Sequence, residues 1–230
     1  MNGLRPNEQR GKTAIALIWA IFGIAGFAVL FRSIDLCVYY IYMNGGETPD
    51  TLINIYDFGI KSASYLTIVA YIISIITFIR WFRRAYYNMN TIQAMEYGDG
   101  WAAGAWFVPI MNLFVPYKMM KELYEDTDRY LLFENSESYT KSLNISHVEL
   151  WWTLWIISRI LGNIIGRIIE LIASSNIVLS VVIAIINLII LMALCIVTVN
   201  VIHRYAEAEK ILYNMQQEGS ETEKEELLSY

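Results

Sequence analysis

The feature that most constrains this chain is a set of long apolar stretches. Residues 14–31 form a run of eighteen residues without a charged side chain. As a helix with a rise of about 1.5 Å per residue, such a run is roughly 27 Å long, close to the thickness of the hydrocarbon layer of a bilayer. Four stretches of this kind predict transmembrane spans, at about 13–43, 64–84, 150–173 and 177–202. We therefore expect an all-α integral membrane protein with a four-helix transmembrane bundle.

The composition agrees with this expectation. Hydrophobic residues make up 56% of the chain, and charged residues only 17%. A water-soluble domain of this size carries more charge, and a disordered chain or a nucleic-acid binder has a different balance. The sequence therefore excludes a simple soluble enzyme, a disordered chain and a nucleic-acid-binding protein.

A fifth apolar stretch, residues 101–117, differs from the four spans. It contains Pro109 and Pro116, and each proline removes a backbone donor and disfavours a straight helix. Its 17 residues are also short for a crossing. We expect a proline-broken segment that is either re-entrant or interfacial, and the sequence leaves open which of the two it is.

The distribution of Lys and Arg predicts the orientation. With four spans, every Lys and Arg residue outside the spans, except Lys61, lies on the same side of the membrane, and that side is normally the cytoplasm. If residues 101–117 crossed as well, most of these residues would lie outside. The prediction is a multi-pass protein of the cytoplasmic (inner) membrane with both termini in the cytoplasm. The cytoplasmic parts are then a tail, a charged helix after the fifth stretch, and a helix with an acidic tail, at 1–12, 117–133 and 204–230.

Three motifs carry a resemblance to a known family. Residues 78–85 read FIRWFRRA and are followed by Asn88, residues 106–117 read WFVPIMNLFVPY, and residues 151–155 read WWTLW. Through these motifs the chain resembles, over about residues 65–200, an uncharacterised family of bacterial multi-span membrane proteins, a domain of unknown function with a W-F-V-P-x-x-N-x-x-x-P-Y signature. The resemblance implies a four-span architecture and supplies no activity.

One candidate binding site lies within the membrane. Arg159, Asn163 and Arg167 follow one another at intervals of four residues, which places them along one face of the third span. Glu170 follows Arg167 by one turn, and Asn187 in the last span could face the same stripe. A charge at such depth costs a few kcal/mol and needs a partner, so the stripe is either a site for a substrate, ion or headgroup or a set of structural pairs.

A second candidate site lies at the cytoplasmic end. It combines Trp106, Pro109, Asn112 and Pro116 of the broken segment with the arginine pair at the end of the second span, Arg83 and Arg84. Broken backbone at membrane depth must be satisfied by protein or water. The segment is therefore either a lip facing lipid or ligand, or an amphipathic element that lies on the inner leaflet.

No catalytic motif, metal-ligand set or cofactor motif is apparent in the sequence. We therefore expect a protein that is not an enzyme, with no cofactor and no metal. The prediction is a module that binds membrane lipids or a partner protein at its cytoplasmic face, and the sequence leaves open a homo-oligomer. The alternative is a small transporter or channel that uses the intramembrane Arg/Asn site.

Overall fold

The structure, a computed structural model, is helical in the part of the chain that it describes. That part comprises residues 3–47, 49–134, 139, 142–172 and 176–228, and the side chains of 163–172 and 220–228 lie outside the description. The elements in chain order are α1 (Glu8–Met43), α2 (Asp50–Ile92), α3 (Trp101–Gly104), the short 3₁₀ helix η1 (Met111–Leu113), α4 (Val115–Phe133), α5 (Ser146–Ile172) and α6 (Ile177–Leu228). No strand occurs among these residues, which confirms the all-α prediction.

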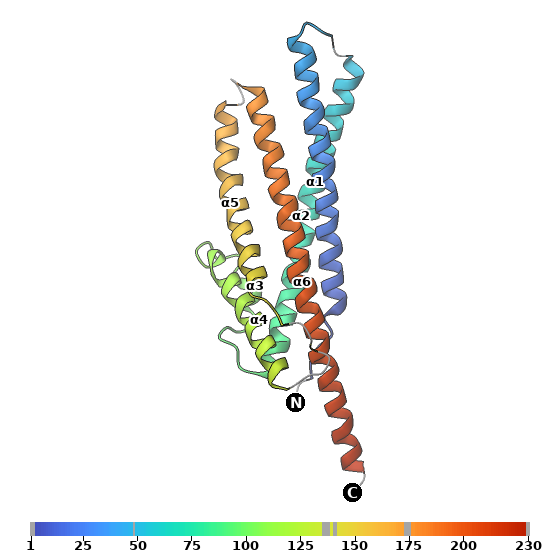
Figure 1. Cartoon of the computed structure of the whole chain (residues 1–230), viewed down its shortest axis with the longest axis vertical. Coiled ribbons are helices and arrows are strands. Elements are labelled where there is room, and N and C mark those ends of the chain that lie inside the picture. Colours follow the sequence, from blue (N-terminus) through green and yellow to red (C-terminus); the bar gives the residue numbers. More distant parts are fainter. Residues whose placement is uncertain (1–2, 48, 135–138, 140–141, 173–175, 229–230) are drawn as a thin grey trace. The chain divides into compact units, whose positions relative to one another are not determined.

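Three of the helices, α1, α2 and α6, are long and apolar enough to cross a membrane. This confirms that the chain has the helices of a membrane protein. Their apolar stretches at 14–31, 65–82 and 177–202 are the candidate membrane-spanning parts, and each helix continues beyond its stretch. α6, the orange-to-red helix that runs to the C-terminal end in Figure 1, reaches Leu228 without a break. The acidic tail is helical because Glu, Gln, Lys and Leu are good helix formers.

The fourth predicted span falls on α5, a helix of 27 residues. Its second half includes Asn163, Arg167 and Glu170, whose side chains lie outside the described part of the structure. Whether α5 crosses the membrane stays a prediction, and so does the four-helix bundle.

The fifth apolar stretch is broken as its prolines require. α3 ends at Gly104, η1 covers Met111–Leu113, and α4 begins at Val115. Pro109 is exposed between α3 and η1, whereas Pro116 is buried in the first turn of α4, where its missing N–H would have had no helical acceptor. The position of this stretch in the membrane, re-entrant or interfacial, stays a prediction.

The chain forms two compact units. One unit comprises Ala16–Ser74 and Trp151–Thr198 and holds the apolar parts of the long helices. Many of its large hydrophobic side chains are exposed, for example Phe58 at 76% and Tyr65 at 71%. Apolar exposure on this scale is unusual for a protein in water and agrees with a lipid-facing surface.

The other unit, which comprises Met1–Ile15, Ile75–Leu150 and Val199–Tyr230, has a dense aromatic core. Trp81 of α2 packs edge to face on Tyr205 of α6, with ring centroids 6.0 Å apart. Tyr124 of α4 stacks on the same tyrosine at 5.9 Å, and its hydroxyl donates to the carbonyl of Val201 at 2.6 Å. All three rings are fully buried. These contacts fix α2, α4 and α6 to one another and so hold the candidate site in place.

Candidate functional site

The site is built on the short segment that precedes α1. Asn88 of α2 pairs with the backbone of Arg5: its Oδ1 accepts from the Arg5 N–H at 3.0 Å, and its Nδ2 donates to the Arg5 carbonyl at 2.9 Å. The backbone N–H of Leu4 donates to Oε1 of Gln216, on α6, at 2.8 Å. The Arg5 guanidinium lies over the ring of Tyr87, with its Cζ 4.2 Å from the ring centroid, in a cation–π contact. Both the backbone and the side chain of Arg5 are therefore fixed.

A buried carboxyl group holds the same segment. Glu209 of α6, only 7% exposed, accepts from Nδ2 of Asn7 at 2.9 Å and from Nδ2 of Asn88 at 2.8 Å. The Asn7 amide also donates to the carbonyl of Trp81 at 3.2 Å. Burial raises the pKa of Glu209 to about 7, and the two amide donors and the positive charge of Arg84 lower it by less than burial raises it. Together these side chains join the N-terminal segment to α2 and α6.

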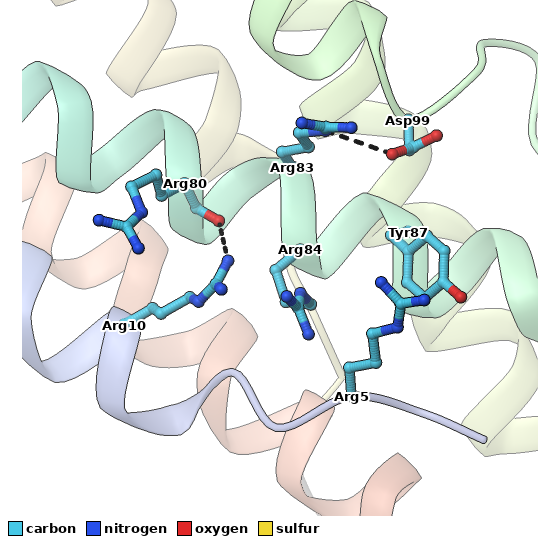
Figure 2. A pocket seen from close by; sticks show the side chains of 7 residues that line it. All are labelled: Arg5, Arg10, Arg80, Arg83, Arg84, Tyr87 and Asp99. Carbon is cyan, nitrogen blue, oxygen red and sulfur yellow. Dashed lines mark hydrogen bonds and ion pairs between the residues drawn. The ribbon is translucent and has the colours of Figure 1, made fainter. Parts of the chain in front are cut away.

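Beside the anchored segment is a pocket of about 310 Å³, called the arginine pocket below. Figure 2 shows its lining: side chains from α2, one arginine from the first turn of α1, one arginine from the segment before it, and an aspartate from the loop after α2. The lining residues are Arg5, Arg10, Arg80, Arg83, Arg84, Tyr87 and Asp99. The pocket therefore carries five guanidinium groups against one carboxylate.

The carboxylate of the pocket is already paired. Arg83 Nε lies 3.3 Å from Oδ2 of Asp99, and both side chains are partly exposed. The loop that carries Asp99 is tied to α2, because the N–H of Tyr97 donates to the hydroxyl of Tyr86 at 3.1 Å. That hydroxyl donates in turn to Oε2 of Glu122, on α4, at 2.5 Å. The aspartate thus has a defined place at the edge of the pocket.

The remaining cations repel one another. A guanidinium N–H of Arg10 donates to the backbone carbonyl of Arg80 at 3.1 Å. Partial burial lowers the pKa of Arg10, and the positive charges of Arg84 and Arg80 lower it further. Arg80 and Arg84 are one turn apart on α2, so their side chains leave the same face of the helix. An anion in the pocket would remove this repulsion and accept hydrogen bonds from several planar donors, so the arrangement is chemically suited to bind an anion.

The structure brings together part of the second predicted site. Arg83 and Arg84 line the pocket. Asp99, the aspartate of the pocket, lies two residues before the start of the broken segment. Trp106 packs edge to face on Phe78 of α2 at 5.8 Å, and its indole N–H donates to the carbonyl of Ala102 at 3.1 Å. Of the other predicted residues, Asn112 is partly exposed in η1, while Pro109 and Pro116 lie before η1 and at the start of α4. These three residues are not in the lining of the pocket.

Among the described residues, a cation–π contact and a hydrogen bond of the intramembrane site each lie within one helix. The Arg159 guanidinium lies 5.3 Å from the ring of Trp155, one turn earlier on α5. The amide of Asn187 donates to the carbonyl of Ile183, one turn earlier on α6, at 3.2 Å. Asn163, Arg167 and Glu170 lie outside the described side chains. The transporter alternative therefore stays a prediction.

Sequence reasoning did not assign Arg5, Arg10, Arg80 and Asp99 to a site. A signal was present: Arg5 and Arg10 precede the first apolar stretch, and Arg80 lies at the end of the second. Consecutive spans run in opposite directions, so these residues are expected at the same end. Asp99 gave no such signal, because its place depends on the fold of the loop. Among the described residues, no group of three or more His, Cys, Asp or Glu could hold a metal ion.

Comparison with known families places the chain in one of them. A family model described as a domain of unknown function, DUF4328, matches residues 49–207, which is more than half of the chain. This chain belongs to the DUF4328 family. The match confirms the resemblance to an uncharacterised family. Of the residues that line the arginine pocket, Arg80, Arg83, Arg84 and Asp99 lie within the matched region. Searches of curated proteins and of solved structures found no match.

Proposed function

We propose that this DUF4328 protein is a non-enzymatic membrane module whose cytoplasmic face binds anionic, phosphate-bearing headgroups of membrane lipids in the arginine pocket. The observation that carries the proposal is the positive charge of the pocket lining. The lining has five guanidinium groups and one carboxylate, and that carboxylate is paired with Arg83. A guanidinium presents a rigid fork of donors that matches the oxygens of a phosphate. A pocket lined by one sign of charge also concentrates ions of the opposite sign.

The place of the pocket along the chain supports a lipid ligand. Arg5 and Arg10 precede the apolar stretch 14–31 by nine and four residues, and Arg83 and Arg84 immediately follow the stretch 65–82. Charged residues that flank apolar spans lie at the level of the headgroups. The asymmetry of Lys and Arg favours the cytoplasmic side for this end.

The broken segment supports the same proposal. Phe107, Ile110 and Leu113 are 75%, 72% and 53% exposed, and the segment follows the loop that carries Asp99. Exposed apolar side chains beside a cationic site are the combination that a protein uses to contact the acyl and headgroup regions of one leaflet. We expect these side chains to contact lipid.

The chemistry of the lining favours binding over catalysis. Five of the seven lining residues are arginines. Because arginine stays protonated, these residues supply charge and hydrogen bonds but do not act as acids or bases. The remaining carboxylate is paired with Arg83. The lining therefore supports recognition of an anion.

The test is thermal unfolding of the full chain in a neutral detergent, with and without short-chain lipids. A ligand that binds the folded state raises the unfolding temperature. We expect dioctanoyl phosphatidylglycerol and dioctanoyl phosphatidate to raise it, and dioctanoyl phosphatidylcholine to leave it unchanged.

A matched pair of variants locates the site. Arg80→Gln with Arg84→Gln removes two cations from the pocket, and Arg129→Gln with Arg204→Gln removes two cations elsewhere in the same unit. We expect the first variant to lose the response to anionic lipid and the second to keep it. Equal responses of the two variants, or equal effects of all three lipids, would refute the proposal. Co-purification of a stoichiometric protein partner without anionic lipid would also refute it, in favour of a protein ligand.

A further inference from the structure

The arginine pocket has more positive charge than a singly charged headgroup can compensate. Asp99 is paired with Arg83, which leaves four guanidinium groups, those of Arg5, Arg10, Arg80 and Arg84, without a carboxylate among the lining residues. Glu209 lies near Arg84, but it is buried and bonded to two asparagine amides outside the pocket lining. The pocket thus holds about four uncompensated positive charges.

Two of these cations, Arg5 and Arg10, are held in place before any ligand arrives. Arg5 is fixed through both backbone groups and through Tyr87. Arg10 is bonded to the Arg80 carbonyl, and Arg80 and Arg84 leave the same face of a helix whose core side is buried. The guanidinium groups of the pocket therefore repel one another when no ligand is bound. A ligand with more negative charge relieves more of this repulsion.

The volume restricts the ligand to a small group. At about 310 Å³ the pocket is at the lower end of the range for small-molecule sites, about 300–1,000 Å³. It has room for a headgroup and not for acyl chains.

Resting on the proposed function, we infer that the arginine pocket selects a headgroup with two or more negative charges, a terminal phosphomonoester or a diphosphate, over a singly charged phosphodiester. A phosphomonoester carries a charge of about −1.5 to −2 at pH 7 and has three terminal oxygens that accept hydrogen bonds. A phosphodiester carries one charge and has two unbridged oxygens, so it compensates fewer of the four guanidinium groups and accepts fewer of their bonds. Inorganic pyrophosphate shares the chemistry of the selected headgroup.

The experiment compares ligands on the unaltered full chain in a neutral detergent. Dissociation constants for dioctanoyl phosphatidate and dioctanoyl phosphatidylglycerol are measured by thermal shift or by native mass spectrometry. We expect phosphatidate to bind at least about tenfold more tightly, a difference of about 1.4 kcal/mol. Equal constants would overturn the inference and leave the proposed function standing, whereas no preference of either lipid over phosphatidylcholine would overturn both.

A competition with inorganic pyrophosphate identifies the source of the anion. Displacement of phosphatidate by pyrophosphate only at concentrations well above the dissociation constant of the lipid supports a lipid headgroup as ligand. Displacement at similar concentrations supports the same polyanion selectivity with a free anion as its source. Failure of pyrophosphate to displace the lipid at all would show that the phosphate is not held by the arginines.

Variants add an independent readout. Arg10→Gln, which lowers the charge of the pocket by one, is expected to reduce the preference for phosphatidate over phosphatidylglycerol. Arg129→Gln makes the same charge change outside the pocket and is expected to keep it. A preference that is the same in both variants would contradict the charge argument.

Discussion

Because its carboxyl group is buried, Glu209 should make the free energy of unfolding depend measurably on pH. Its ordinary pKa is 4.5, and burial raises it to about 7 in the folded protein, against the smaller lowering by the Asn7 and Asn88 amides and by Arg84. Between these two values the folded state holds a proton that the unfolded state has released. The proton therefore stabilises the folded state at low pH, and this stabilisation is lost as the pH rises through about 7.

The size of the effect follows from the two pKa values. A rise from 4.5 to about 7 corresponds to about 3 kcal/mol of free energy of unfolding. Most of it, about 2–3 kcal/mol, appears between pH 5 and pH 8. The contribution is fully present below pH 4.5 and absent above about pH 8.

Glu209→Gln removes the titration and keeps the shape of the side chain. The Gln carbonyl can accept from the Asn88 amide as the carboxylate does. Its NH₂ group can donate to Oδ1 of Asn7 once the Asn7 amide turns over, at the loss of the bond that Asn7 donates to the Trp81 carbonyl. We therefore expect the variant to fold and to lose the pH dependence that Glu209 contributes.

The assay is unfolding of the full chain in a neutral detergent at pH 5 and pH 8, followed by tryptophan fluorescence. We expect the wild type to lose about 2–3 kcal/mol more stability over this interval than Glu209→Gln. The control is Glu134→Gln, because Glu134 is exposed at the end of α4 and its removal should leave the wild-type slope in place. Equal pH slopes for the wild type and Glu209→Gln would refute the reasoning.

Three other substitutions test the packing around the site. Asn88→Ala removes both bonds to the Arg5 backbone and should destabilise the protein by about 2–3 kcal/mol, with faster hydrogen exchange at the N-terminal segment. Gly11→Val should destabilise it by about 1–3 kcal/mol, because a Cβ at Gly11 would already lie 3.3 Å from the buried Trp81 ring. Tyr124→Phe loses the bond to the Val201 carbonyl and should cost about 1 kcal/mol, and both losses are measured by the same unfolding assay. No change of stability in any one of these variants would contradict the contact on which it is based.

The membrane helices could be predicted from the sequence because lipid imposes a simple requirement. A span must be long, apolar and helical, so the run at 14–31 and the stretches inside α2 and α6 were evident without any tertiary information. The proline-broken stretch followed from Pro109 and Pro116 for the same local reason. Helix length beyond the apolar part was harder to predict, because α2 and α6 continue through polar residues whose helix propensity alone gives no boundary.

The site was predictable only in part. Arg83 and Arg84 stood out as a charged pair at the end of a span, but the contribution of Arg5 depends on its bonds to Asn88, which is 83 positions later in the chain. The partnership of Asn7 with Glu209 spans 202 positions. Such contacts have no local pattern in the sequence, since they depend on how three helices pack around one aromatic core.

The anchoring of the N-terminal segment explains how a pocket of like charges persists. Repulsion from Arg84 and Arg80 acts against the placement of further cations, yet Leu4, Arg5 and Asn7 are each held by a side chain of α2 or α6. These bonds offset the repulsion and keep the pocket formed without a ligand. An anion that binds the folded state at one hundred times its dissociation constant should stabilise the fold by about 2.7 kcal/mol. If the anchors are weakened by Asn88→Ala, the ligand must also order the segment, and the same anion should bind more weakly although every arginine is still present.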